Sequence, residues 1–393
     1  MDTLFRFENN LYGDEFCEDV VEITDVEFWV DRLVQLPLFR PFCLEKATCL
    51  CCHYCSIDDF RVQFIEKSIS VSPVLLYRVF YNGIIPFSEI FPFIMQKGCL
   101  YGVYYFRKLL PDFDAILDSK RHENDDDLFS GNESDLELMI EYGFVPNTME
   151  YILKYDDIES LLSMDIQNRI NEKAKWSPFE WSKKPNYLDF LAVSGYFGSI
   201  QCFKQLMLNG FIINHEVMSN VVCGGNSCLF HICFSETMNC SHLSLYASEY
   251  LRISLLQFLF EKNIDINAKN QNGMSSIFLA SINGHIGIVD FLNEHNADVN
   301  ITESNQQTPL HGGAKNGHLN IVDLLVKNGA IIGCLDDCKQ TPIQIAVEFN
   351  RLKIVQLLLS KGQNINANNT ENMITISIFH CYILQQARDI LIL

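Results

Sequence analysis

The chain has 393 residues and a net charge of −20, with 48% hydrophobic and 20% charged residues. This length exceeds what a single hydrophobic core usually supports, so we expect two or three structural units. The negative charge disfavours nucleic acid and anionic membrane surfaces as partners, because both attract basic proteins.

The chain start lacks the basic and apolar regions of a secretory leader, and no apolar stretch reaches the ~18 to 20 residues of a membrane span. We therefore expect an intracellular protein, cytoplasmic or also nuclear, without membrane contact. Its 15 cysteines are then expected to be mostly free thiols.

Residues 1–110 are predicted to form an N-terminal helical domain. Apolar residues recur at mostly helical spacing from residue 24 onward, and prolines and glycines divide them into four to six helices. The clearest helix opens at Pro73, with Ser72 as its candidate N-cap, and ends at Asn82–Gly83. The many Phe and Tyr residues predict a largely aromatic core.

The segment CLCCHYC places four cysteines and one histidine within residues 49–55. Structural zinc usually takes two ligand pairs from separate elements, and only the pair Cys52 and Cys55 is present at zinc spacing. Free cysteine also packs well as a small buried hydrophobe. We interpret the segment as a cysteine-rich turn of a helix and predict neither a metal nor a cofactor. The alternative function is a metal- or redox-responsive protein that uses the cluster Cys49–Cys55.

Residues 111–137 are predicted to be an acidic linker. They carry 2 Lys or Arg against 10 Asp or Glu, and such a stretch cannot bury enough apolar surface to order itself. The alternative is a docking strip for a basic partner.

Residues 138–249 hold segments with a looser pattern of two apolar stretches around a turn. The segments are 148–165, 188–210 and 221–234, with Gly198 and Gly225–Asn226 at predicted turns. We interpret them as degenerate copies of the repeat that follows, the first being a capping half-copy.

The region 250–393 contains the regular repeats and an irregular C-terminal cap. Three gapless copies of 33 residues occupy 270–302, 303–335 and 336–368, after a half-copy at 251–269. One period after the third copy's TPIQIA, residues 374–379 read ITISIF, without an N-cap threonine or a proline. This tail is either a poor cap, which we favour, or an exposed apolar surface that awaits a partner.

The middle copy shows the physical basis of the unit. Thr308 can cap the first helix, Pro309 suits its first position, and Gly317 can end it with a positive φ. The second helix carries an apolar stripe of Ile321, Val322, Leu324 and Leu325. Neither helix can bury its apolar face alone, so the copies are expected to stack into a solenoid.

The pattern TPLHGGAKNGHLNIVDLLVKNGA resembles the ankyrin repeat. The resemblance implies two antiparallel helices and a projecting β-hairpin per copy, and hence an all-α, ankyrin-type helical solenoid behind an N-terminal helical bundle. It also implies that His311 braces the hairpin through hydrogen bonds, and we interpret His285 and His318 alike. With its helical N-terminus and degenerate middle, the chain further resembles protist ankyrin-repeat families.

We predict a non-enzymatic, monomeric scaffold or adaptor that binds an unidentified partner protein. The resemblance implies a concave face made by hairpin tips and first-helix ends, where we expect Met274, Ile282 and Phe349 to be the apolar anchors. An enzyme with an ankyrin targeting half would need a pocket in residues 1–110, and no catalytic motif supports it. The candidate partner-binding residues are Gln271, Asn272, Met274, Ile282, Asn283, Ser304, Asn305, Gln307, Lys315, Asn316, Asp337, Cys338, Gln340, Glu348 and Phe349.

Overall fold

The structure of the protein is a computed structural model. It describes residues 30, 33–34, 44–97, 103, 105–110, 133–170, 172–174, 189–234 and 242–362. Over these ranges every regular element is a helix, apart from two isolated β-bridges, which confirms the all-α prediction. The chain divides into two compact units, Met1–Cys233 and Phe234–Leu393, and each is described by itself. The domain boundaries expected from the sequence remain predictions.

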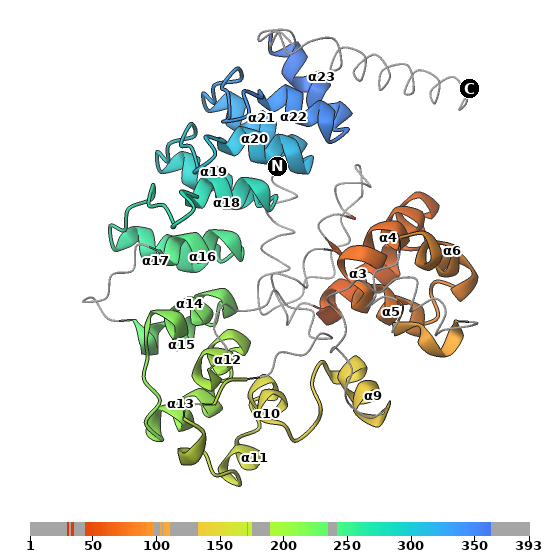
Figure 1. The fold of residues 1–393 in the computed structure, drawn as a ribbon, viewed down its shortest axis with the longest axis vertical. Helices are drawn as coiled ribbons and strands as arrows, with labels where there is room; N and C mark the ends of the chain where they lie inside the picture. Colours follow the sequence, from red (N-terminus) through yellow and green to blue (C-terminus); the bar gives the residue numbers. More distant parts are fainter. Residues whose placement is uncertain are drawn as a thin grey trace. The chain divides into compact units, whose positions relative to one another are not determined.

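The first unit begins with a helical bundle. Its described helices are α3 (Leu44–Tyr54), α4 (Asp58–Val71), α5 (Pro73–Tyr81) and α6 (Phe87–Lys97), followed by the 3-10 turn η2 (Arg107–Leu109) (Figure 1). Helix α5 packs against α3 and α4, and α4 packs against α6. The prediction of a largely aromatic core is wrong, because Val, Leu and Ile make up most of the buried side chains. Aromatic rings still contribute, with Phe60, Phe64 and Phe106 fully buried.

Helix α5 has the predicted ends, but Ser72 does not cap it through its side chain. The backbone N–H of Ser72 instead donates to the carbonyl of Ser68 and closes the preceding helix, at a φ of −144° and a ψ of 67°. The hydroxyl of Ser72 is buried without a hydrogen-bond partner. Ser72 is the single residue between α4 and α5. Its backbone closes the end of α4, and in this conformation its side chain does not cap the start of α5.

The same unit continues with short helices in pairs. They are α9 (Glu133–Tyr142), α10 (Met149–Tyr155), α11 (Ile158–Leu162), η3 (Gln167–Arg169), α12 (Phe190–Phe197), α13 (Ile200–Leu208), α14 (His215–Gly224) and α15 (Ser227–Cys233). The first helices pack in the order α10, α12, α14, and α11 packs against α13. Residues 133–137 of the expected linker belong to α9, and its remainder lies outside the described residues.

The three segments with the looser repeat pattern overlap these helix pairs, although 221–234 includes only the end of α14 together with α15. The turn residues Gly198 and Gly225 have φ values of 75° and 79°, as their predicted positions require. The segment 148–165 forms two helices rather than one half of a pair. Asp156, between them, accepts hydrogen bonds from the backbone of Gln201 and Cys202 and so caps α13 of the next pair.

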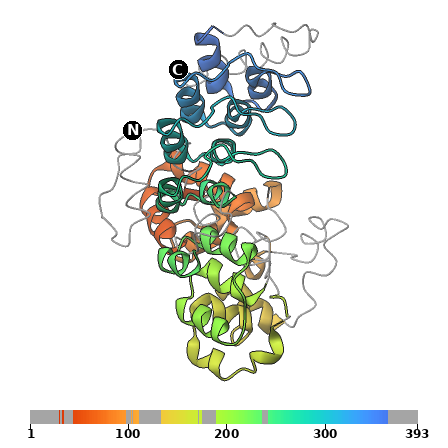
Figure 2. The same cartoon turned by 90° about the vertical axis from the view of Figure 1, so that its left-hand side faces the viewer.

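The second unit is a stack of four helix pairs. Its helices are α16 (Leu243–Glu249), α17 (Ile253–Glu261), α18 (Ser276–Ile282), α19 (Ile286–Glu294), α20 (Pro309–Asn316), α21 (Leu319–Lys327), α22 (Pro342–Glu348) and α23 (Leu352–Ser360). The first helices follow one another as α16, α18, α20 and α22, and the second helices α19, α21 and α23 form a parallel row (Figure 1). The loops that join successive pairs project to one side (Figure 2).

The details of the middle copy agree with the sequence prediction. Thr308 precedes α20, Pro309 is its first residue, and Gly317 ends it with a φ of 88°. Leu292, Leu325 and Leu358 lie 33 residues apart and are each fully buried. The core of this unit is therefore a column of equivalent side chains contributed by successive copies. The tail 363–393 lies outside the described residues.

Candidate partner-binding face

The projecting loops are tight turns held by one side chain each. Asn270, Glu303 and Asp336 occupy the same place in three copies, and each side-chain oxygen accepts a hydrogen bond from the backbone N–H four residues further on, at 2.9, 3.2 and 2.8 Å. The backbone closes each turn as well, at 3.0 Å in all three copies. Within the part of the chain that the structure describes, the β-structure at these loops is limited to one isolated bridge, between Lys269 and Ser275. The loops are therefore tight hairpin turns and do not extend into a two-stranded β-ladder.

Successive tips are joined to each other. The N–H of Ser304 donates to the carbonyl of Asn272 at 3.1 Å, and the N–H of Asp337 donates to that of Asn305 at 3.0 Å. The ammonium group of Lys269 adds a bond to the carbonyl of Thr302 at 2.7 Å. The tips consequently have fixed relative positions, which pre-organises the side chains that they carry.

A second series of bonds joins the turns between the paired helices. His285 Nε2, His318 Nε2 and Arg351 Nε bond to backbone carbonyls of the preceding copy at 2.9, 3.1 and 3.1 Å. The acceptors are Glu249, Ile282 and Lys315, so donors and acceptors both repeat every 33 residues. Arg351 was not among the residues predicted to bond in this way, although it stands in the alignment column of His285 and His318.

His311 is a structural residue, as predicted. The N–H of Thr308 donates to His311 Nδ1 at 3.1 Å, so Nε2 carries the proton and donates to the carbonyl of Gln340 at 3.2 Å. Burial lowers the pKa of His311, which favours this neutral form. Cys334 lies 3.8 Å from His311, but burial raises the pKa of its thiol, so the pair is unsuited to nucleophilic chemistry.

The fifteen candidate partner-binding residues lie at the tips and around the C-terminal ends of the first helices. The half-buried ones are Met274, Ile282, Asn283, Gln307 and Gln340. The exposed ones are Gln271, Asn272, Ser304, Asn305, Lys315, Asn316, Asp337, Cys338, Glu348 and Phe349. We call these fifteen residues the tip face.

Two of the three expected anchors have specific neighbours. Phe349 is 41% exposed, and the ammonium group of Lys315 lies 5.2 Å from its ring centroid, a cation–π distance. Ile282 leans toward the next copy, because a Cβ at Gly312 would come within 2.5 Å of Ile282 Cγ2. Part of the Ile282 surface is thus used for packing between copies, and the remainder is available on the tip face.

Charge is nearly absent from the tip face in the first two copies, where Lys315 is the charged member. In the third copy Asp337 and Glu348 are charged, and Glu348 accepts a hydrogen bond from Gln340 Nε2 at 3.0 Å. Glu303 and Asp336 lie at the base of the tips but are buried. The tip face therefore presents mainly amide and apolar groups.

The cysteine cluster lies on α3 and just beyond its end, as predicted. Cys51 and Cys55 are buried, which raises the pKa of Cys51 and raises that of Cys55 to about 12. Both are therefore protonated at neutral pH and poor as metal ligands or nucleophiles. In the described part of the chain no group of three or more His, Cys, Asp and Glu residues could hold a metal ion.

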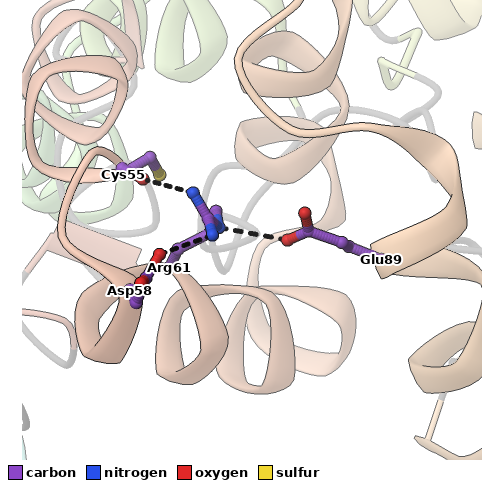
Figure 3. Close-up of polar contacts among 4 residues, drawn as sticks. All are labelled: Cys55, Asp58, Arg61 and Glu89. Carbon is purple, nitrogen blue, oxygen red and sulfur yellow. Dashed lines mark hydrogen bonds and ion pairs between the residues drawn. The ribbon is translucent and has the colours of Figure 1, made fainter.

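An ion-pair cluster that the sequence analysis missed lies beside these cysteines (Figure 3). Arg61 contacts Glu89 at 3.0 Å through Nε and Asp58 at 2.6 Å through Nη2, and Nη1 donates to the carbonyl of Cys55 at 3.3 Å. The guanidinium group joins the end of α3 and the beginnings of α4 and α6. Since two carboxylates already surround it, this arginine is a structural link and not an anion site.

Among the described helices, none has the length and apolar character needed to cross a membrane.

A comparison with protein families finds a match, which lies within the second unit. A model of the ankyrin repeat family, described as ankyrin repeats (3 copies), matches residues 243–336 and 295–369. The match begins at α16, so it includes the helix pair before the first regular copy. A search of curated proteins found no match.

Proposed function

Since the C-terminal half of this chain carries ankyrin repeats, which generally mediate protein–protein interaction, we propose that the protein is a scaffold or adaptor that binds a partner protein on its tip face. We further propose that the protein is non-enzymatic, monomeric and intracellular, and that it does not bind nucleic acid. The net charge of −20 supports the exclusion of nucleic acid, since phosphate binding needs a basic surface.

The observation that carries the proposal is the rigid presentation of the tips. Buried or turn-bonded side chains hold each tip, and backbone bonds join neighbouring tips, so exposed side chains at the tips such as Asn272 and Asn305 are not needed to hold them. A binding surface benefits from this arrangement, because little conformational entropy is lost on binding.

Met274, Ile282 and Phe349 are the proposed anchors. Apolar and aromatic side chains account for much of the binding energy of interfaces when a partner removes them from water. Phe349 is the proposed anchor of the third copy, since it is 41% exposed and the ammonium group of Lys315 lies 5.2 Å from its ring centroid.

The test is a pull-down with the full-length chain, followed by affinity measurement for the partner it identifies. The triple variant Met274→Ala, Ile282→Ala and Phe349→Ala is expected to weaken binding tenfold or more, since three anchors together contribute over ~1.4 kcal/mol. A partner that binds this folded variant as well as the wild type would contradict the proposal.

The matched control removes exposed apolar side chains elsewhere. Leu208, Ile212 and Leu359 are 82%, 80% and 40% exposed and lie outside the tip face. Their triple replacement by alanine is expected to leave the affinity unchanged. Circular dichroism of both variants distinguishes lost contacts from lost folding.

A metal- or redox-responsive role for Cys49–Cys55 has less support. The two buried thiols are held protonated, and Cys52, which is half-buried, accepts a hydrogen bond from Asn82 Nδ2 at 3.6 Å. Elemental analysis of the reduced full-length protein tests this alternative, and stoichiometric zinc or iron would revive it.

A further inference from the structure

The two sides of the second unit differ in charge. The second helices carry Glu261, Asp290, Glu294, Asp323, Lys327 and Lys353, and Lys361 directly follows α23. By contrast, the tip face of the first two copies carries Lys315 and is otherwise uncharged. Depletion of charge is a compositional mark of the central part of protein interfaces, because an uncharged surface loses water at lower cost.

The uncharged residues of the tip face are mostly carboxamides with unused hydrogen-bonding capacity. In the described residues, the side-chain amides of Gln271, Asn272 and Asn305 make no hydrogen bond, although all three are exposed. Asn283 Nδ2 is buried without a partner. Its counterpart one period later, Asn316, does donate, to the carbonyl of Ile282 at 2.9 Å. The amides of the first copy are thus the freer ones.

A carboxamide has the donor and acceptor of a peptide group and carries no charge. A row of such groups can pair with the N–H and C=O groups of an extended backbone, whatever the side chains of that segment are. Met274 and Ile282 lie among these amides and offer apolar contacts for alternate side chains of the segment.

The exposed charges at the tip face and directly beside it favour neither sign. Lys315 of the second copy and Lys339, next to the tip face in the third copy, balance Asp337 and Glu348, so the sum of these four charges is zero (+2 − 2). A strongly acidic or basic partner would therefore gain no net electrostatic attraction from this face, and binding of an uncharged partner should depend little on salt.

We infer that the tip face binds an extended, uncharged polypeptide segment with apolar side chains, recognised largely through its backbone. This inference rests on the proposed function and specifies the partner's chemistry.

The experiment uses the full-length protein as bait for displayed random peptides. An enriched peptide is synthesised with a fluorescent label, and its affinity is measured by anisotropy at about 50 mM and about 500 mM salt, which span strong to weak screening. The expected peptide has no net charge, and its affinity changes less than about twofold between the two salt concentrations.

Variants test the role of the amides. The double variant Asn272→Ala and Asn305→Ala is expected to weaken peptide binding about tenfold, as the loss of two hydrogen bonds implies. The control pair Asn320→Ala and Gln356→Ala changes exposed amides on α21 and α23 and is expected to have no effect.

Four outcomes overturn the inference, and the last of them overturns the proposed function as well. Enriched peptides could be strongly charged and lose affinity in high salt, or the double variant could bind as well as the wild type. Alternatively, no peptide is enriched while a folded partner binds and is lost on replacing Met274, Ile282 and Phe349. That last result would leave the proposed function intact. If the peptide and the partner both bind the triple variant as well as they bind the wild type, the assignment of binding to the tip face is wrong.

Discussion

At the scale of single residues, equivalent positions of the repeat solve the same problem with different side chains. His311 and Gln344 both stand three residues into a first helix, and each accepts the N–H of the threonine before that helix, at 3.1 and 2.8 Å. Only the histidine can titrate near neutral pH. The middle copy therefore has a pH-dependent cap and the third copy has not.

Replacing His311 by Gln tests this difference. Burial lowers the pKa of His311 in the folded protein below its ordinary value of about 6.5, although Gln340, Asp336 and Glu303 oppose the shift. The unfolded chain then binds a proton before the folded one, so this residue's contribution is complete above pH 6.5 and is lost as pH falls toward the folded pKa.

The expected result is a smaller loss of stability between about pH 7.5 and 5.0 in His311→Gln than in the wild type. Urea unfolding at both pH values measures it. The control His311→Ala loses the cap at every pH and is expected to cost about 1 to 3 kcal/mol. Equal pH dependence of wild type and His311→Gln would show that His311 is not the titrating group.

At the scale of elements, the helices of the regular repeats were predictable because several local signals coincide in each copy. Thr308, Pro309 and Gly317 fix the ends of α20 by cap chemistry, a preset φ and a positive φ. Ser72 shows the limit of such signals, since its role depends on a helix that ends directly before it.

The interactions between elements were less predictable. Glu89 lies 28 residues after Arg61, and no periodicity links them, so their ion pair needed the fold to be seen. The residues of the tip face could be proposed only because the repeat resembles a known one. Which amides stay free, as at Asn272, and which are bonded, as at Asn316, depends on packing between copies.

Adjacent glycines of α20 provide a test of that packing. Gly312 faces Ile282, whose Cγ2 would lie 2.5 Å from an added Cβ, whereas the closest atom to an added Cβ at Gly313 is 3.4 Å away. The other copies have alanine at the position of Gly313, as Ala280 and Ala346 show.

Gly313→Ala is expected to stabilise the protein by about 0.5 to 1 kcal/mol, since it removes the backbone entropy cost of glycine in a helix. Gly312→Ala gains the same entropy but must displace a β-branched side chain, so we expect a net loss of about 1 to 3 kcal/mol. Thermal unfolding compares the two. A stabilising Gly312→Ala would mean that Ile282 moves away from the α18–α20 contact at little cost.

At the scale of the molecule, the second unit has the energetics of a one-dimensional stack. Each first helix packs on its neighbours in the row, and α21 lies between α19 and α23. In such a stack the stability of a copy depends on its interfaces as much as on its own helices. A substitution that destabilises an inner copy should therefore also destabilise the copies on both sides of it.

Leu325 and Leu358 allow a matched comparison, because they occupy the same position in α21 and α23 and are both fully buried. Either change to alanine is expected to cost about 2 to 5 kcal/mol, since each leaves a cavity. Leu325→Ala is expected to be the more damaging, because α21 contacts second helices on two sides.

Hydrogen exchange followed by mass spectrometry distinguishes local from shared loss. Leu358→Ala is expected to accelerate exchange mainly in α22 and α23, whereas Leu325→Ala should accelerate it in α18–α19 and α22–α23 alike. If both variants raise exchange equally throughout α16–α23, the four helix pairs unfold as one cooperative body. Coupling between nearest neighbours would then be stronger than the stability of any single pair, and the tip face would be lost as a whole rather than copy by copy.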